Sequence, residues 1–179
     1  ISEGIIEKLE TIASAGVSGI TTGYAKVDQI LRGGFQHGDM VVIAARPSHG
    51  KTAIALNIAY RAAKSGATPF LVSLEMSREA ICERFMGIHC DADLEKLYGQ
   101  FTADGQIRKV RSGLSSWERL PIHMCDESNL NISRIAHRCV SFAQRHENAI
   151  IIIDYLQLIS GDKSRGREVE IADISRQIK

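Results

Sequence analysis

The sequence predicts an α/β fold in which a mostly parallel, twisted sheet carries helices on both faces. Short runs that are apolar throughout alternate with longer segments whose apolar residues recur at helical spacing. Strands that are apolar on both faces are typical of parallel sheets covered on both sides. A length of 179 residues with 44% hydrophobic residues suits one domain with its own core.

The expected elements follow one another in the order strand, helix, strand. Strands are expected at residues 40–45, 69–74, 121–125 and 149–154. Helices are expected at residues 52–64, 77–88, 92–97, 103–118, 131–145 and, after a polar loop at 160–167, at 168–179. A short helix is also expected at residues 1–15, before three glycines that break the pattern. We therefore divide the chain into a linker helix, residues 1–16, and an α/β domain, residues 17–179.

Composition excludes some classes of protein and leaves others open. The sequence contains no run of 18 apolar residues, so no membrane-spanning helix is expected. The first ten residues lack the layout of a signal peptide. The net charge of +1 neither demands nor excludes nucleic acid. Four cysteines without a CxxC pair favour reduced thiols inside a cell. Three close His/Cys pairs are poorly spaced for zinc. Their side chains are either packed in the core or exposed at the surface, or else they form a metal site of unusual spacing.

Residues 45–52 carry the sharpest motif. They match the P-loop pattern GxxxxGK[ST] at seven of eight positions, with an apolar run before them and a helical pattern after them. The residues are Ala45, Arg46, Pro47, Ser48, His49, Gly50, Lys51 and Thr52. Such a loop wraps its backbone N–H groups around phosphates at a helix N-terminus, which predicts an ATP site.

Particular residue types explain the spacing of this motif. Gly50 allows close approach of the backbone, Lys51 supplies one positive charge between the β- and γ-phosphates, and Thr52 offers a hydroxyl ligand to Mg²⁺. Ala45 stands where the first glycine is usual, and it fits if its φ is negative. His49 occupies a variable position and is interpreted as a solvent-facing residue of the loop.

Strand ends supply the candidate acidic residues. Asp154 ends the run IIIID about 100 residues after the P-loop, which is typical of a Walker B aspartate that reaches the Mg²⁺ shell beside Thr52. Glu75 follows the expected strand 69–74, where it either orients and deprotonates the attacking water or is a plain carboxylate near the cap Ser77. Gln157 either senses the nucleotide or DNA or is a bystander.

One loop offers candidate contacts to nucleic acid. Lys163, Arg165 and Arg167 lie within five positions among Gly and Ser residues, without an interleaved aromatic residue. Such a loop tracks a phosphate backbone, or it is simply a solvated loop.

The motifs together resemble the C-terminal motor domain of DnaB-type replicative helicases. The resemblance covers residues 17–179 and rests on ARPSHGKT, SLEM, LPIHMCD, IIIIDYLQLIS and RGREVEIADISRQIK, with TTGY and Asp28 at the entry to the domain. SLEM and DYLQL separate this family from other RecA-like ATPases.

The resemblance implies a RecA-like P-loop NTPase that uses ATP and Mg²⁺, and a homohexameric ring that translocates on single-stranded DNA. It implies Lys51 and Glu75 as catalytic residues, Thr52 and Asp154 at Mg²⁺, and Lys163, Arg165 and Arg167 at DNA. It also places residues 1–15 as a linker helix that docks on the adjacent subunit, through Ile5, Leu9 and Ile12. Primase and a helicase loader are implied partners, in a bacterial, phage or plasmid context in the cytoplasm.

Two departures and one alternative remain. Ala45 replaces a glycine, and the family's later sensor strand, second DNA loop and arginine finger would follow residue 179, so we expect little hydrolysis from this segment alone. The alternative function is a RecA- or KaiC-like ATPase that acts in recombination or regulation without unwinding. A downstream arginine finger would favour the helicase.

Overall fold

The computed structural model describes residues 4, 6–7, 10, 19–46, 48–93, 96, 103–127 and 131–154. The elements with defined bounds are α2 (Ala25–Ile30), α3 (Lys51–Lys64), β1 (Thr68–Ser73), α4 (Arg78–Cys90), α6 (Ala103–Trp117), β2 (His123–Cys125), α7 (Ile132–Ala143) and β3 (Ala149–Asp154).

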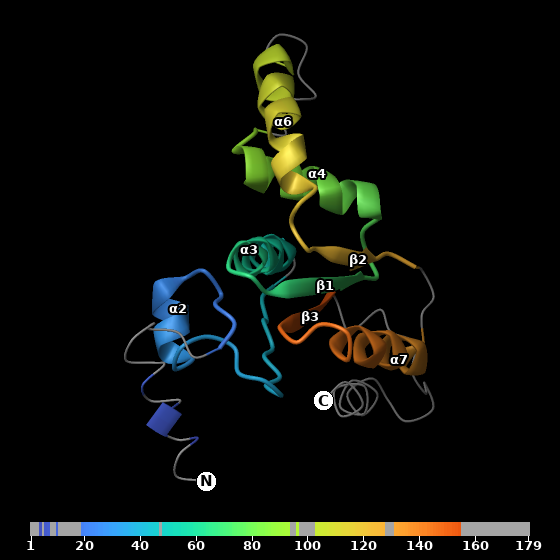
Figure 1. Ribbon diagram of the computed structural model, residues 1–179. Coiled ribbons are helices and arrows are strands. Elements are labelled where there is room, and N and C mark those ends of the chain that lie inside the picture. Colours follow the sequence, from blue (N-terminus) through green and yellow to red (C-terminus); the bar gives the residue numbers. More distant parts are fainter. Residues whose placement is uncertain are drawn as a thin grey trace.

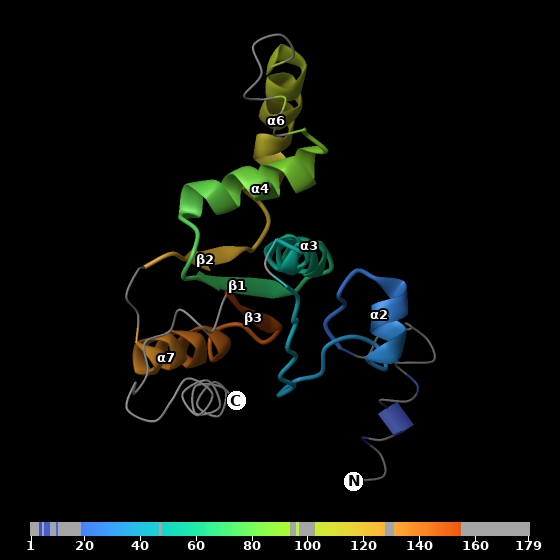
Figure 2. The same ribbon diagram turned by 180° about the vertical axis from the view of Figure 1, so that it is seen from behind.

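A parallel sheet lies at the centre of these elements. Its strand order is β2-β1-β3, and both pairings of β1 are parallel. The helices α3 and α4 cover one face of the sheet and α7 covers the other, as Figures 1 and 2 show from opposite sides. The α/β fold with helices on both faces is therefore confirmed.

The central strand β1 serves two hydrophobic cores because successive side chains point to opposite faces of a sheet. Phe70 and Val72 pack with α7, where the rings of Phe70 and Phe142 stack with their centroids 4.7 Å apart. Leu71 points the other way and packs with Leu56 of α3 and with buried residues of α4. The unbroken apolar run that predicted this strand reflects these two buried faces.

Two helices begin where their sequences supply a cap. Ser77 accepts a hydrogen bond from the backbone N–H of Ala80 at the start of α4, as predicted. Asn131 accepts one from the N–H of Arg134 at the start of α7. Polar side chains thus satisfy N–H groups that have no partner within the helix.

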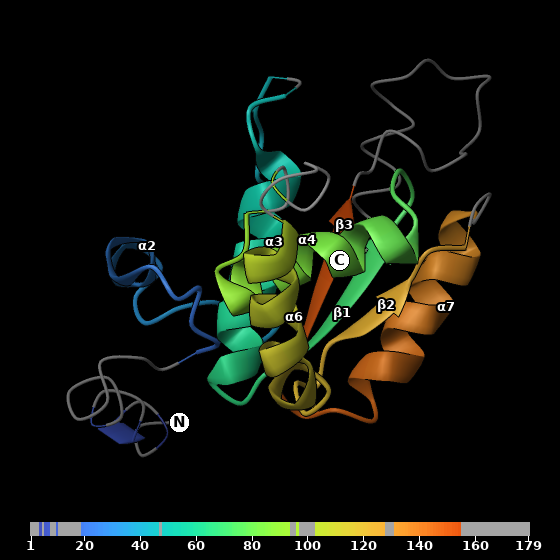
Figure 3. The same cartoon turned by 90° about the horizontal axis from the view of Figure 1, so that it is seen from above.

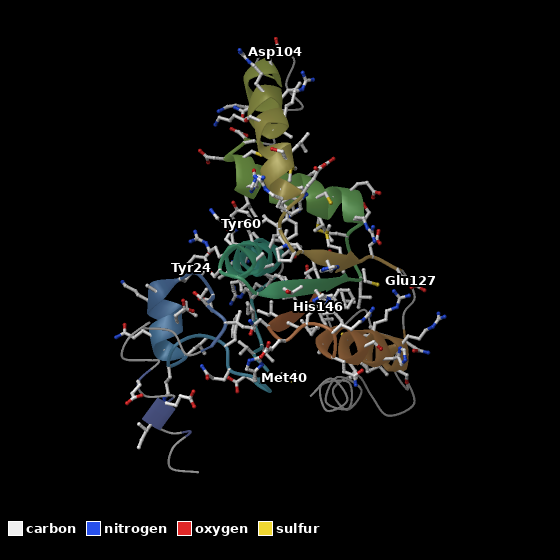
Figure 4. The ribbon with its side chains drawn as sticks, in the orientation of Figure 1. Tyr24, Met40, Tyr60, Asp104, Glu127 and His146 are labelled. Atoms are coloured by element: carbon white, nitrogen blue, oxygen red, sulfur yellow. The ribbon has the colours of Figure 1, made fainter. Side chains whose placement is uncertain are left out.

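The expected strand at residues 40–45 is wrong for this structure. These residues belong to no strand and are exposed: the side chains of Val42 and Ile43 are 68% and 43% accessible. Met40 lies at the margin of the molecule, apart from the sheet (Figure 4). Apolar, β-branched composition favours a strand only where a neighbouring strand supplies ladder partners. In the described part of the chain β3 pairs with β1 alone, so residues 40–45 lack that ladder.

A buried carboxylate organises residues 21–28, the segment at which the chain enters the domain. Asp28 of α2 is 7% accessible and accepts three hydrogen bonds, from Thr21 Oγ1 at 2.6 Å and from the backbone N and Oγ1 of Thr22, both at 2.7 Å. Burial alone would raise its pKa, but these hydrogen bonds together hold the pKa of Asp28 below its ordinary value of 3.8. The Arg61 guanidinium of α3 lies over the Tyr24 ring, 4.8 Å from its centroid, and ties this entry to the domain.

Several expected elements lie largely or wholly outside the described residues. These are the helices at 1–15, 92–97 and 168–179 and the loop at 160–167. Among the residues that the structure does describe, no helix is long and apolar enough to cross a membrane.

Replacing Asp28 by Asn tests the organisation of this entry. We expect Asp28→Asn to lower the free energy of unfolding by about 1.5–3 kcal/mol at pH 7, because charge-assisted hydrogen bonds are lost. The depressed native pKa means that this contribution is present above pH 3.8 and is lost as the pH falls through the native pKa of Asp28. Urea denaturation across pH 2.5–7 should therefore show the gap between the two proteins closing in acid.

Asp39→Asn is the matched control for this substitution. Asp39 is exposed and accepts one hydrogen bond, from the N–H of Gln36 at 3.2 Å. Its replacement should change the unfolding free energy by less than about 0.5 kcal/mol. A gap for Asp28→Asn that stays constant down to pH 2.5 would contradict the assigned role of this carboxylate.

Candidate functional site

The loop before α3 presents backbone N–H groups to an anion. Ser48 and Gly50 both have left-handed backbones, with φ of 62° and 79°. Gly50 is the N-cap of α3, and no described side chain caps that end of the helix. The first-turn N–H groups and the helix dipole therefore favour a negatively charged ligand there. Ala45 is not among the residues with positive φ, so its methyl group imposes no backbone strain.

The first turn of α3 meets the tip of β3. The Thr52 hydroxyl donates a hydrogen bond of 2.7 Å to Asp154 Oδ2, although the two residues are 102 positions apart in sequence. Viewed from above, α3 starts beside the end at which the strands finish (Figure 3). Ligands of parallel α/β sheets bind at this carboxyl edge.

A tight turn carries Glu75 to the same edge. β1 ends at Ser73, which pairs in register with Asp154, and the Leu74 N–H donates to the Asp154 carbonyl at 2.9 Å. The buried Ser73 hydroxyl accepts from the N–H of Met76 at 3.1 Å and lies 2.8 Å from the Met76 carbonyl. Glu75 lies inside this turn with an exposed side chain. The Glu75 turn, residues 73–78, therefore stands beside the Thr52–Asp154 contact.

The structure brings together part of the predicted site. Thr52 and Asp154 meet at the carboxyl edge, with Lys51 as the first residue of α3 and Glu75 on the adjacent turn. The remaining described loop residues are exposed: Ala45, Arg46, Ser48, His49 and Gly50. The other predicted residues lie outside the described ones: Ile5, Leu9, Ile12, Pro47, Gln157, Lys163, Arg165 and Arg167.

The donor atoms at the edge fit a hard divalent cation. A hydroxyl and a carboxylate 2.7 Å apart are oxygen ligands of the kind that Mg²⁺ prefers, and Mg²⁺ takes few protein ligands when a phosphate supplies the rest. Asp154 is 9% accessible, which limits competing solvation of its carboxylate. The edge can therefore hold a magnesium-bound phosphate.

Asp126 was missed by the sequence analysis. It follows β2 directly and accepts a hydrogen bond of 3.0 Å from the N–H of Arg78, the first residue of α4. The signal was present, because Asp126 follows an expected strand in the same way that Asp154 ends one. Its significance needed the strand order, since only the structure shows β2 beside β1.

His89 and Cys90, one of the close His/Cys pairs, both line a pocket between three helices. His89 lies 3.1 Å from the Tyr60 hydroxyl and 2.8 Å from the Ser116 hydroxyl, on the wall of a pocket of about 470 Å³ between α3, α4 and α6. Burial, with a contribution from Cys125, raises the pKa of Cys139 to about 11, so this thiol is protonated at neutral pH. Among the described residues, no group of three or more His, Cys, Asp or Glu side chains could hold a metal ion.

Comparison with known proteins gives the family. Residues 19–179 match the model of the DnaB-like helicase C-terminal domain. The chain belongs to this family. Its P-loop, its SLEM turn and its strand-end Asp154 all lie within the matched region of this DnaB-like domain.

Individual relatives agree with this assignment. The DnaB-like domain is 34% identical over 166 residues to the replicative DNA helicase DnaC of Bacillus subtilis, covering 91% of this chain and 36% of that protein. It is 27% identical to a solved ATPase domain, with a TM-score of 0.85, covering 99% of this chain and 64% of that one.

A second solved structure is that of a DnaB-like replicative helicase and its interactions with primase. It is also 27% identical, with a TM-score of 0.83, and the match covers 99% of this chain and 44% of that one. The DnaB-like domain thus spans about a third of the length of the curated relative and part of each solved chain.

Two glycine substitutions separate backbone strain from ligand binding. Gly50 and Gly38 have φ of +79° and +81°, and an added methyl group would meet no atom closer than 4.0 Å at either position. We expect Gly50→Ala and Gly38→Ala each to lower the unfolding free energy by about 1–2 kcal/mol, the cost of a left-handed backbone. Only Gly50→Ala should also weaken binding of a fluorescent MgATP analogue in titration. Equal affinity of the two variants would remove Gly50 from the binding site.

Proposed function

We propose that this domain is the ATP-hydrolysing motor of a replicative DNA helicase, which unwinds duplex DNA by moving along single-stranded DNA. The observation that carries the proposal is the contact of Thr52 with Asp154, 2.7 Å across the carboxyl edge of a parallel sheet, in a chain of the DnaB-like family. The relative from Bacillus subtilis is a replicative DNA helicase, which supports the same activity for the whole protein.

The chain's own residues supply binding and proton transfer. The N–H groups of Ser48 and of residues 50–52 bind the phosphates of ATP, and the Lys51 ammonium offsets the charge that develops during phosphoryl transfer. Thr52 and Asp154 hold Mg²⁺, which supplies electrostatic stabilisation of the β- and γ-phosphate oxygens when bound. Glu75 orients the attacking water and accepts its proton. Because Glu75 lies in a turn anchored to Asp154, one rigid edge positions both carboxylates.

Assembly into a homohexameric ring completes the proposed motor. An arginine from a neighbouring subunit stabilises the transferring phosphoryl group, which is worth about 10³–10⁵ in rate in related NTPases. A linker helix at residues 1–16 docks on that neighbour through Ile5, Leu9 and Ile12. Gln157 senses the nucleotide or the DNA. The solved relative that interacts with primase supports primase as a partner, and a helicase loader completes the set.

Glu75→Gln and Lys51→Ala test the assigned roles in the whole protein. Glu75→Gln should keep MgATP affinity within about threefold and lower DNA-stimulated turnover by about 10²–10⁴, because an amide cannot accept a proton. Lys51→Ala should weaken MgATP binding itself by about 1.5–3 kcal/mol. Equilibrium titration and steady-state hydrolysis distinguish the two. Near wild-type turnover by Glu75→Gln would make Glu75 a structural carboxylate.

Three basic residues are the proposed contacts to single-stranded DNA. We expect the triple replacement of Lys163, Arg165 and Arg167 by Ala to reduce the log–log salt dependence of binding by about 0.7 for each lost phosphate contact. Fluorescence anisotropy at several salt concentrations measures that slope. Replacing the exposed Arg108, Lys109 and Arg111 of α6 by Ala removes the same charge and is the control. Equal slopes for the two triple variants would remove the loop from the DNA path.

A further inference from the structure

The Glu75 turn has a third anchor, at its far end. Its near end is fixed by a hydrogen bond that the Leu74 N–H donates to the Asp154 carbonyl. Its middle is fixed by the hydrogen bonds between the Ser73 hydroxyl and the backbone of Met76. At the far end the N–H of Arg78 donates to Asp126 Oδ2 at 3.0 Å. Asp126 belongs to neither β1 nor α4, so it ties the turn to a different strand, β2.

Asp126 reaches this N–H because of the strand register. Val72 of β1 pairs with Cys125 of β2, so Asp126 lies one position further along the same carboxyl edge. The Arg78 side chain returns to β2 as well: its Nε lies 3.7 Å from Asp126 Oδ1, and its Nη2 donates to the Met124 carbonyl at 3.3 Å. The start of α4 is therefore clamped onto β2 through both backbone and side chain.

The two neighbours of Asp126 in sequence contact the opposite helix layer, α7. Glu127 forms ion pairs with Arg134 and Arg138 of α7, and Arg138 Nη1 also lies 3.3 Å from the Cys125 sulfur. Residues on both sides of Asp126 thus contact α7. Because the two ion pairs of Glu127 are solvent-exposed, they contribute little to fixing Asp126. Figure 4 shows Glu127 just beyond the end of β2.

The two kinds of contact to Arg78 differ in importance. The ion pair is solvent-accessible, with 56% of the Arg78 side chain and 32% of the Asp126 side chain exposed, and exposed pairs contribute little. The N–H of Arg78 is one of the donors that a helix start leaves without an intrahelical partner, and a carboxylate there also interacts favourably with the helix dipole. The backbone hydrogen bond is therefore the contact that fixes the turn.

We propose that Asp126 is a positioning residue for ATP hydrolysis, which acts by accepting the first N–H of α4 and so fixing the turn that carries Glu75. The proposal rests on the proposed function of Glu75 as the group that accepts a proton from water. Asp126 itself touches neither substrate nor metal. Its loss frees one end of the turn, and misplacement of a base by a fraction of an ångström lowers the rate of the step that needs it.

The test compares caps of two helices in the whole protein, with DNA-stimulated hydrolysis as the assay. Asp126→Ala should lower kcat by about 10–100-fold while KM and MgATP affinity stay within about threefold. Asn131→Ala is the matched control. It removes the side chain that caps α7 by accepting a 2.9 Å hydrogen bond from the Arg134 N–H, and α7 covers the other face of the sheet. It should leave kcat within about twofold. Equal effects of the two variants on kcat would overturn the proposal.

Conservative variants keep the test decisive if Asp126→Ala folds poorly. Asp126→Asn retains an oxygen that accepts from the Arg78 N–H, and Arg78→Ala retains that N–H while losing the ion pair. Both should keep kcat within about threefold of wild type. A loss in either variant as large as that expected for Asp126→Ala would show that the ion pair matters instead, and would also overturn the proposal.

A double-mutant cycle tests whether Asp126 acts through Glu75. In a Glu75→Gln background, adding Asp126→Ala should lower single-turnover hydrolysis by less than about twofold, because the base is already absent. If the rate reductions caused by the two substitutions multiplied in the double variant, Asp126 would act independently of Glu75. If Glu75→Gln alone kept wild-type turnover, the proposed role of Glu75 would fail first, whereas normal kcat in Asp126→Ala with an inactive Glu75→Gln would reject only the role of Asp126.

Discussion

The hydrogen bond between Thr52 and Asp154 is the contact on which the rest of the site depends. It joins the first turn of α3 to the tip of β3 across 102 residues of sequence, at 2.7 Å. The polarity of the sheet makes this contact possible, because parallel strands all finish at one edge and the helix that follows the P-loop starts at that edge. Each further functional side chain lies at that edge because its strand ends there.

Rigidity at this edge comes from backbone groups more than from ion pairs. Asp154 contributes its carboxylate to Thr52 and its carbonyl to Leu74, so one residue fixes both the helix start and the Glu75 turn. The buried Ser73 hydroxyl closes the same turn. Below the edge, β1 packs against both helix layers, which keeps the strand ends from shifting relative to each other.

Much of this arrangement could be predicted from the sequence, for identifiable physical reasons. The runs at 69–74 and 149–154 are apolar on both faces, and they became the paired strands β1 and β3 within one residue of their expected bounds. The residue spacing of the P-loop is rare outside phosphate-binding loops. It therefore predicted the roles of Lys51 and Thr52 and their position at the start of a helix. The run at 40–45 is also apolar and partly β-branched, as β3 is, but it lacks a ladder partner in the described structure. The composition of a segment indicates whether it prefers to be buried, whereas its pairing as a strand depends on other strands that are far away in the sequence.

The same limit explains why Asp126 was overlooked. Nothing in residues 121–127 indicates that β2 lies beside β1, and the hydrogen bond to Arg78 spans 48 positions. Asp154 was identified from its distance after the P-loop, but no comparable spacing marks Asp126, so its role became visible only once the order of the strands was known. Residues placed by local motifs were therefore accessible to prediction, and residues placed by strand order were not.

The central position of β1 also has a consequence for the order in which the chain can fold during synthesis. β1 is complete at Ser73, but its full-length partner β3 ends at Asp154 and its other partner contributes only three residues. A ribosome adding about 5–20 residues per second needs roughly 4–16 seconds to make the intervening segment. Until residue 154 is made, the edge of β1 that pairs with β3 lacks its native partner, whereas α3 precedes β1 in the chain and β2 is complete at Cys125. The central strand of the finished domain thus forms its most extensive pairing last, after the helices that cover its two faces have been made.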